Sequence, residues 1–406
     1  MSRSHQKTVQ RRRVFYVPGY DPIHPRRYRE LYRKEGAAQA AISGYDIALQ
    51  PGAGEDHYGW QVDAVIDDTR VHADINVLVW SDIVRDSMAS TIPATYAQLV
   101  QTAWTYIASG ALSRLMRLRK GPIIAALYPV GMLLGQLMLA LLAWWALFRF
   151  GGLFGSVGAW LGLVLGLGAF VALLRWFKAK DGKLFAYYLM HDYAYSAATN
   201  GANPPELETR MATFRASIAA ALHEDVDEVL VVGHSSGAHL AVSILADLIR
   251  AGEMRANGPA LSFLSLGQVV PMVSFLPDAY RLRADLQYLS TRDALTWVDV
   301  TAPGDGCAFA LCDPVSVSGV APAGKRWPLV FSAQFTKSLS PKRWSELRWR
   351  FFRLHFQYLC AFDRPLDYDY FQITAGPRTL AARYADRPPS KSRIDVAVSK
   401  YTSIAA

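Results

Sequence analysis

Apolar residues along this chain recur in the two patterns that distinguish strands from helices. The continuous apolar run at residues 229–232 is mostly β-branched and is typical of a buried parallel strand. Directly after it, Leu240, Ile244 and Leu248 recur with the spacing of one helix face. Strands are predicted at residues 14–17, 45–49, 60–66, 73–80, 229–232, 260–268, 295–300 and 327–331, and a helical stretch at residues 91–117, in which Leu99, Trp104 and Ile107 would share one face.

Two longer apolar runs in the middle of the chain contain no charged residue. They cover residues 122–148 and 150–174, and each exceeds the roughly 20 residues that a helix needs to cross a hydrocarbon core. Since only Arg149 and the pair Gly151-Gly152 separate them, we expect a tight antiparallel hairpin. Two buried core helices are the alternative, although a core helix of this length usually has a polar face. Glycines at every fourth position would let the helices approach closely in lipid: Gly131 and Gly135 in the first run, and Gly158, Gly162 and Gly166 in the second.

Basic residues on both sides of the two runs predict how such a hairpin is oriented. Lysine and arginine cluster at residues 114–120 before it and at residues 175–183 after it, whereas the connection holds Arg149 alone. By the positive-inside rule, both flanks remain in the cytoplasm. The sequence therefore predicts an integral membrane protein whose remaining parts are cytoplasmic.

The chain as a whole is basic, with a formal net charge of +9 at pH 7. Arginine and lysine gather at residues 26–34, at residues 342–353 and in the opening segment, which has no apolar stretch and is therefore not a signal peptide. Next to a hairpin, such clusters predict anionic lipid headgroups as the partner. No nucleic-acid motif accompanies them, which disfavours nucleic acid, and a solvated basic face is the alternative for any one cluster. The basic residues of the opening segment are Arg3, Lys7, Arg11, Arg12 and Arg13.

Residues 233–237 read Gly-His-Ser-Ser-Gly and join the strand at 229–232 to the helix that follows it. This fits the Gly-x-Ser-x-Gly nucleophile elbow, a sharp turn that projects the serine hydroxyl above the sheet edge. Gly233 and Gly237 are needed on either side of Ser235 because the backbone is strained there and neighbouring chains pack too closely for a side chain. The alternative is an ordinary strand-to-helix crossing whose serine only caps the helix.

A second segment fits the same chemistry near the N-terminus. The predicted strand at 14–17 ends in Pro18-Gly19-Tyr20-Asp21. A serine acyl-transfer site needs two backbone N–H donors for the developing oxyanion, one from the residue after the nucleophile and one from a loop after an early strand. The N–H groups of Ser236 and Tyr20 would be these donors. An ordinary Pro-Gly turn is the alternative for residues 18–21.

Together these segments resemble the α/β-hydrolase superfamily, in its lipase and esterase branch. A strand, an oxyanion-type loop and a helix are followed by a strand that ends in a Gly-x-Ser-x-Gly elbow. The resemblance covers residues 13–49 and 204–359 and leaves the middle of the chain unexplained. It implies an α/β fold with a mostly parallel sheet flanked by helices, into which the apolar hairpin is inserted.

The resemblance also implies two catalytic partners for the serine, in the chain order serine, acid, histidine. In the family the acid lies on the loop after a late strand, and Asp305, which follows the predicted strand at 295–300, matches that place. Asp299 and Asp313 are the alternatives. His355 matches the base, because it is the only histidine beyond the last predicted strand. A half-buried helix histidine is the alternative for His355.

A chain of this kind would be a membrane-anchored serine hydrolase. It would cleave a carboxylic ester or thioester of a lipid-like substrate through an acyl-enzyme intermediate. An acyltransferase or peptidase on the same triad and a non-catalytic membrane scaffold are the alternatives. No residue spacing indicates a metal site or a phosphate-binding loop, so no metal and no other cofactor is expected. The three cysteines, Cys307, Cys312 and Cys360, are expected to be reduced.

The chain is accordingly divided into four parts. Residues 1–120 would form the N-terminal part of the hydrolase core with the oxyanion loop, and residues 121–176 the transmembrane hairpin. Residues 177–386 would complete the core with the elbow, the acid and the histidine, and residues 387–406 would be a flexible tail. His234 and His239, on either side of the serine, are expected to pack or to line the substrate site.

Overall fold

The computed structural model describes residues 8–52, 58–88 and 91–406. Arg3 and Lys7 of the basic opening segment lie outside these residues. Eight strands form one mixed sheet in the order β2-β3-β4-β1-β5-β6-β7-β8. Neighbours pair in parallel from β4 through β1 to β8, whereas β2, β3 and β4 pair antiparallel. The strands are β1 (Arg11–Val17), β2 (Asp46–Pro51), β3 (Gly59–Ile66), β4 (Thr69–Val77), β5 (Glu228–His234), β6 (Ala260–Leu266), β7 (Thr296–Thr301) and β8 (Leu329–Ser332).

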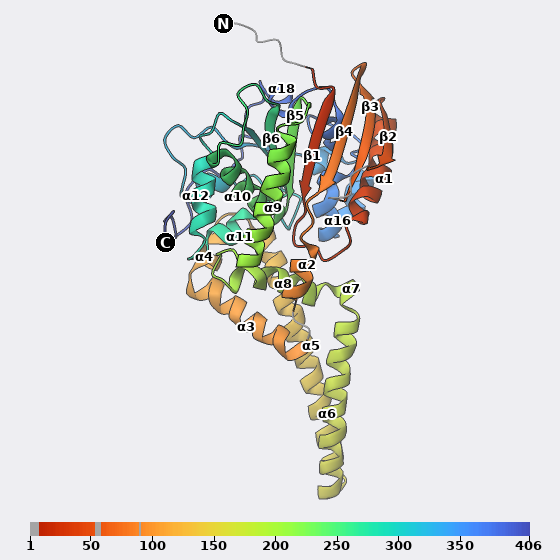
Figure 1. Ribbon diagram of the computed structural model, residues 1–406. Helices are drawn as coiled ribbons and strands as arrows, with labels where there is room; N and C mark the ends of the chain where they lie inside the picture. Colours follow the sequence, from red (N-terminus) through yellow and green to blue (C-terminus); the bar gives the residue numbers. More distant parts are fainter. Residues whose placement is uncertain (1–7, 53–57, 89–90) are drawn as a thin grey trace.

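The central strands are covered by helices on both faces, and their sequences explain why. Every residue of β5 is buried, and its middle four residues, Val229 to Val232, are apolar on both sides of the strand. Val229 and Val231 pack in one core cluster with α9, α10 and α12, whereas Leu230 and Val232 pack in another with α1 and the C-terminal helices. The predicted α/β class with helices flanking a mostly parallel sheet is confirmed (Figure 1).

The structure has helices in the predicted helical stretch, in both apolar runs and after the elbow, and further short helices in both halves of the chain. They are α1 (Arg26–Ser43), α2 (Ser81–Ser87), α3 (Ile92–Ala108), α4 (Ala111–Leu115), α5 (Lys120–Gly152), α6 (Gly155–Ala179), α7 (Asp181–Leu184), α8 (Ala186–Ala197), α9 (Pro205–Ala221), α10 (Gly237–Arg250), α11 (Val270–Ser274), α12 (Tyr280–Leu289), α13 (Pro314–Val317), α14 (Phe335–Ser338), α15 (Pro341–Leu347), α16 (Phe351–His355), the 3-10 helix η1 (Phe356–Leu359), α17 (Tyr370–Ala375) and α18 (Leu380–Arg383).

Helices α5 and α6 form an antiparallel hairpin that projects from one end of the α/β core (Figure 1). Both are long and apolar enough to cross a membrane, by length and composition. Only 28% and 17% of their most apolar stretches are buried, less than core helices of a soluble protein would show. The connection differs from the prediction, because α5 continues through Arg149 to Gly152 and the turn falls at Leu153 and Phe154.

Glycines bring the two helices of the hairpin together, as predicted for the second run. A Cβ atom on Gly162 would lie 2.5 Å from Leu147 O, and one on Gly166 would lie 2.8 Å from Trp144 O. The prediction for the first run is wrong: among the described residues, nothing lies within 4 Å of a Cβ built on Gly131 or Gly135. Gly151 takes their place, because the first half of α5 packs against α8 and the second half against α6.

The helical stretch predicted at 91–117 is divided into α3 and α4. The division falls at Gly110, whose positive φ of 75° ends the first helix. The predicted common face is wrong, because Leu99 is buried while Trp104 and Ile107 are 73% and 62% exposed. At the other end of the chain, the segment 387–406 runs along the core, where Ile394 pairs with Cys312.

Candidate active site

Ser235 lies in a sharp turn between β5 and α10, at the carboxyl end of the sheet's central parallel strands. Its φ of +56° is in the left-handed region, which is strained for a residue with a side chain. Its N–H donates to Leu266 O at 2.9 Å, which holds the turn against β6. A Cβ on Gly233 would lie 2.7 Å from Ala238 Cα, and one on Gly237 would clash with Val17 O in β1. The geometry therefore has the features of the predicted elbow, and both glycines are required by close packing.

The loop after β1 lies directly against this turn. A Cβ on Gly19 would lie 3.0 Å from Ser235 Cβ and 3.5 Å from Ser235 Oγ, so a side chain here would crowd the serine. Within the described residues, neither the N–H of Tyr20 nor that of Ser236 donates a hydrogen bond. Two backbone donors beside Ser235 are thus left available, as an oxyanion site requires.

Contacts from Trp80, just before α2, and from α8 hold the loop in place. The indole Nε1–H of Trp80 donates to Pro18 O at 3.0 Å. The hydroxyl of Tyr188, in α8, donates to Tyr20 O. These two contacts fix the peptide units on either side of the Gly19–Tyr20 peptide, which carries the Tyr20 N–H.

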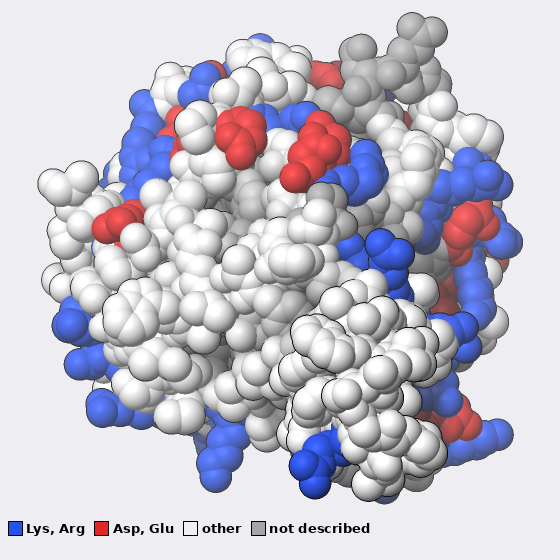
Figure 2. Space-filling view, turned by 90° about the horizontal axis from the view of Figure 1, so that it is seen from below, with Lys and Arg blue, Asp and Glu red and all other residues white. Residues whose placement is uncertain are grey.

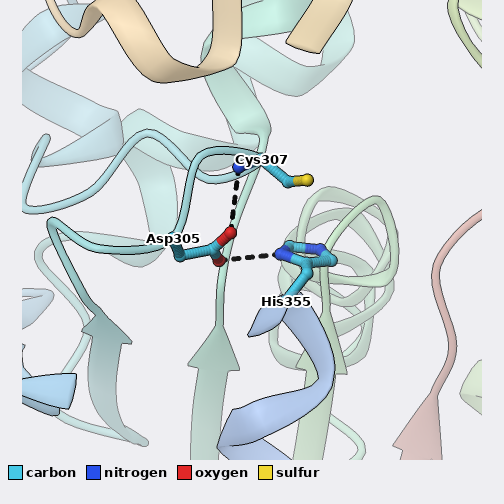
Figure 3. Close-up of side chains that lie close together, drawn as sticks. All are labelled: Asp305, Cys307 and His355. Atoms are coloured by element: carbon cyan, nitrogen blue, oxygen red, sulfur yellow. Dashed lines mark hydrogen bonds and ion pairs between the residues drawn. The ribbon is translucent and has the colours of Figure 1, made fainter. Parts of the chain in front are cut away.

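Asp305 and His355 form a buried pair. The Nδ1–H of His355 donates to Asp305 Oδ2 at 2.8 Å (Figure 3). The same oxygen accepts from the hydroxyl of Tyr358 at 3.0 Å, and Asp305 Oδ1 accepts from the N–H of Cys307 at 2.9 Å. With Nδ1 protonated, Nε2 is the basic nitrogen of His355. The carboxylate thus fixes both the tautomer and the orientation of the imidazole.

The two alternative acids have other partners. Asp299 Oδ1 accepts from Ser265 Oγ at 2.6 Å, and burial raises the pKa of Asp299 to about 8. Asp313 caps α13 and pairs with Lys325 at 2.5 Å. Over the described residues, neither carboxylate has a hydrogen bond or ion pair with His355. The structure pairs His355 with Asp305.

Ser235 and His355 line one small cavity of about 90 Å³. His355 Nε2 is buried and has no hydrogen-bond partner within the described chain, Ser235 Oγ included. Catalytic hydrogen bonds of this kind are often loose without substrate. The nitrogen that would accept the serine proton is therefore unoccupied and in the same cavity as the serine.

His234 and His239 also line this cavity. His234 Nε2–H donates to His355 O at 3.0 Å, and the two rings lie 4.8 Å apart between centroids. Burial lowers the pKa of His234 well below its ordinary value and that of His239 to about 4, so both are neutral near pH 7. His234 thus supports the backbone of His355, and His239 contributes an uncharged wall.

Asp192, in α8, is a cavity residue that the sequence analysis missed. Its segment, residues 186–197, carries no recognisable motif, so no sequence signal pointed to it. No hydrogen bond or ion pair of this carboxylate is found among the described residues. Burial raises the pKa of Asp192 to about 7, and the proximity of His355 acts in the opposite direction. A partly buried carboxyl without a partner, next to His355, is typical of a functional site.

The root of the apolar hairpin forms part of the same cavity. Pro122, near the start of α5, lines it together with residues of α8 and α16. A larger cavity of about 900 Å³ adjoins it, with Tyr188 and Phe352 in the walls of both. The larger cavity extends to Asp181 and Gly182 in α7, just beyond the end of α6. The candidate site therefore opens toward the end of the molecule from which the hairpin projects.

Figure 2 shows this end of the molecule. Uncharged residues cover most of the middle of the face, and lysine and arginine lie mainly around its edge. Arg117 and Lys120 before the hairpin and Arg175 and Lys180 after it are all exposed.

No metal site was predicted, but Asp305, Cys307 and His355 offer three ligand atoms within 4.8 Å of one another. Their contacts favour an acid–base pair instead. Both oxygens of Asp305 already accept hydrogen bonds, and burial raises the pKa of the Cys307 thiol, with a further contribution from Asp305. A protonated thiol is a poor metal ligand.

Comparisons with protein-family models, with curated proteins and with solved structures give no match. The function therefore has to be inferred from the site itself.

Proposed function

We propose that this chain is a membrane-anchored serine hydrolase of the α/β-hydrolase type, which cleaves a carboxylic ester or thioester of a lipid-like substrate. One observation carries the proposal. Ser235 occupies a left-handed strand-to-helix turn and lines the same cavity as the buried His355–Asp305 pair. A strained serine, a histidine with a free nitrogen and a carboxylate that orients it are the three groups of acyl-transfer chemistry, and they occur in the expected chain order.

In the first half of the reaction, Ser235 Oγ attacks the carbonyl carbon of the ester while His355 Nε2 takes the hydroxyl proton. Asp305 stabilises the imidazolium that forms, through its hydrogen bond to Nδ1. The N–H groups of Tyr20 and Ser236 bind the oxyanion of the tetrahedral intermediate. His355 then returns the proton to the departing alcohol or thiol, which leaves Ser235 acylated.

In the second half, a water molecule attacks the acyl carbon and gives its proton to His355. The tetrahedral intermediate collapses, the carboxylic acid is released, and His355 returns the proton to Ser235. The chain's own residues supply every proton transfer in this sequence.

The membrane part of the proposal places α5 and α6 across a bilayer. The helices are apolar and largely unburied, and basic residues flank both of their outer ends. By the positive-inside rule the core is cytoplasmic. Pro122 brings the base of the hairpin to the cavity wall, which favours a substrate that reaches Ser235 from the bilayer.

Two other functions use the same architecture. An acyltransferase or a peptidase would share the triad and differ in the acceptor or in the scissile bond. A non-catalytic membrane scaffold would leave Ser235 unreactive, which the strained conformation of this serine disfavours.

A fluorophosphonate probe tests the proposal, because it labels activated serines. The full-length protein in detergent should be labelled and should cleave p-nitrophenyl esters. Ser235→Ala and His355→Ala should each abolish labelling and cleavage, and the double variant should lose no more, because the two groups act as a unit. Ser113→Ala, at an exposed serine in α4, is the matched control and should match the wild type. Unlabelled wild-type protein would favour the scaffold.

A further inference from the structure

Within the described chain, the ionisable residues of the small cavity include aspartates but no lysine or arginine, although the protein as a whole is basic. The aspartates are Asp21 and Asp192. Asp21 is compensated, because it forms an ion pair with Arg27 at 3.2 Å and accepts from the hydroxyl of Tyr28. Asp192 lacks such a partner among these residues. It is therefore the carboxyl group of the cavity that has no hydrogen bond or ion pair with a described residue.

The tyrosines around Asp192 do not satisfy it. The hydroxyl of Tyr106 donates to Met272 O at 2.9 Å, and that of Tyr188 donates to Tyr20 O. Both rings, with that of Tyr193, nevertheless line the cavity. A carboxylate removed from water is costly unless a cation pairs with it, and aromatic rings beside it suit a cation further.

We propose that the small cavity binds an ammonium group carried by the substrate close to its ester carbonyl, with Asp192 as the counter-ion. The size of the cavity agrees, since about 90 Å³ admits only a small group, whereas pockets for drug-sized ligands measure roughly 300–1,000 Å³. The adjoining cavity of about 900 Å³ takes the remainder of the molecule. This inference rests on the proposed function and specifies the substrate class as cationic amphiphilic esters.

A pair of esters that differ in one charge tests it. A choline ester and the uncharged 3,3-dimethylbutyl ester of the same acid have the same shape, so the ratio of their kcat/KM values isolates the charge. The wild type should favour the choline ester at least about tenfold, a difference of about 1.4 kcal/mol. In Asp192→Asn this ratio should approach one, whereas Asp293→Asn, at an exposed acid paired with Arg326, should keep the wild-type ratio.

The outcomes separate the two proposals. A wild type that cleaves both esters equally, or an Asp192→Asn variant that loses both activities in the same proportion, overturns the cation site alone. A wild type that cleaves neither ester and takes up no fluorophosphonate overturns the hydrolase, and the cation site with it.

A different observation, the inverted polarity of α3, carries a second inference. Three of the residues that α3 buries are threonines, Thr95, Thr102 and Thr105. Its outer side carries Val100, Trp104 and Ile107, and no residue of α3 is charged. A surface helix of a soluble protein has the opposite arrangement, with apolar residues inside and charged residues outside.

The length of the hairpin points to the same surface. The hydroxyl of Tyr96 in α3 donates to Leu133 O at 2.8 Å, and Gln136 is buried, so α5 is packed against the core as far as Gln136. Residues 137–152 of α5 extend roughly 24 Å at about 1.5 Å per residue, which is less than the roughly 30 Å of a hydrocarbon core. The hairpin spans a bilayer only if the face that bears α3 enters it too.

We infer that the outer row of α3, Val100, Trp104 and Ile107, lies in the boundary between the headgroups and acyl chains of the bilayer. The surrounding charge agrees with this location. Lysine and arginine lie around the edge of this face, where they meet anionic headgroups (Figure 2). α3 thus sets how deep the core lies, and it holds the candidate site at the membrane surface.

Spin labels on the full-length protein test this arrangement. With Trp104→Cys labelled by a nitroxide in vesicles containing phosphatidylglycerol, relaxation should respond to oxygen, which concentrates in lipid, and little to a water-soluble nickel chelate. A label at Ile42→Cys, an exposed apolar position of α1, should respond to the chelate instead. Unmutated protein measures the background of the native cysteines. If the chelate reaches the label at residue 104 as readily as the label at residue 42, residue 104 lies in water. If neither oxygen nor the chelate reaches it, residue 104 is covered by a second copy of the protein. Either result overturns the inference.

Discussion

Gly121, at the start of the apolar hairpin, packs against Gly306 in the loop that carries Asp305. A Cβ atom on Gly121 would lie 3.1 Å from Gly306 Cα. Arg119 secures the contact, because its Nε–H donates to Ala310 O at 2.7 Å. The hairpin and the loop that orients His355 are therefore in direct contact, and a change at the hairpin's base should affect the site.

Gly121→Val should lower turnover on a water-soluble ester. The larger side chain would displace the loop around Gly306, and a displacement of about 1 Å can cost on the order of 10²-fold in rate. Gly131→Val, in the same helix, is the matched control, because no described atom lies within 4 Å of a Cβ at this position. Equal kcat values for the two variants would show that the contact does not position Asp305.

Substitutions of single aspartates should show which of them is the acid that orients His355. Asp305→Asn should lower kcat by roughly 10⁴-fold, as expected when a triad carboxylate loses the charge that orients the histidine. Asp299→Asn should have a small effect on kcat, because its carboxyl bonds to Ser265 and not to His355. Steady-state kinetics on one soluble ester measures both, and the reverse order would transfer the role of acid to Asp299.

Asp299 should instead affect stability in a pH-dependent way. Burial raises its pKa from 3.8 to about 8, so between these values the folded protein holds a proton that the unfolded chain releases. The free energy of unfolding therefore falls as pH rises through this window. Asp299→Asn removes this effect. The melting temperature of the variant should therefore rise relative to that of the wild type as the pH is raised from 5 to 8.5. If the difference between the two melting temperatures stays constant over this pH range, the pKa of Asp299 is not raised in the folded protein.

Shortening the hairpin should separate membrane attachment from chemistry. Replacing residues 138–171 with a Gly/Ser linker keeps the packed part of α5 up to Gln136, so a short soluble ester should still be cleaved. Alkaline carbonate should now extract the protein from membranes, and cleavage of a bilayer-embedded ester should fall further than that of the soluble one. Retention in the membrane after carbonate, or equal loss on both esters, would contradict the anchor.

A larger deletion gives the complementary result. Removing residues 121–174 also removes Gly121, which packs against the loop that carries Asp305, and Pro122, which lines the cavity. Activity on the soluble ester should then be lost along with membrane attachment.

Local patterns predicted the strand, the turn and the helix around Ser235, which the structure contains. The turn at Ser235 needs glycine within two residues on either side, so five consecutive residues and the strand before them were enough to identify it. The partner of His355 was a different matter, since Asp299, Asp305 and Asp313 all lie near the end of one strand. Strand β7 buries Asp299 within the sheet beside Ser265, and α13 uses Asp313 as its cap, which leaves Asp305 to reach His355.

The sequence by itself predicted the strands, the strand-to-helix turn at Ser235 and the two membrane-length helices, because each leaves a pattern of residue types within one short segment of the chain. Tertiary structure decided which surfaces and side chains meet. The apolar residues of α3 occur on more than one side of the helix, so their spacing could not tell that Trp104 faces outward. Asp192 has no motif and enters the site only because α8 packs beside the elbow. Burial, and with it the pKa of Asp192, depends on neighbours that are distant in the chain.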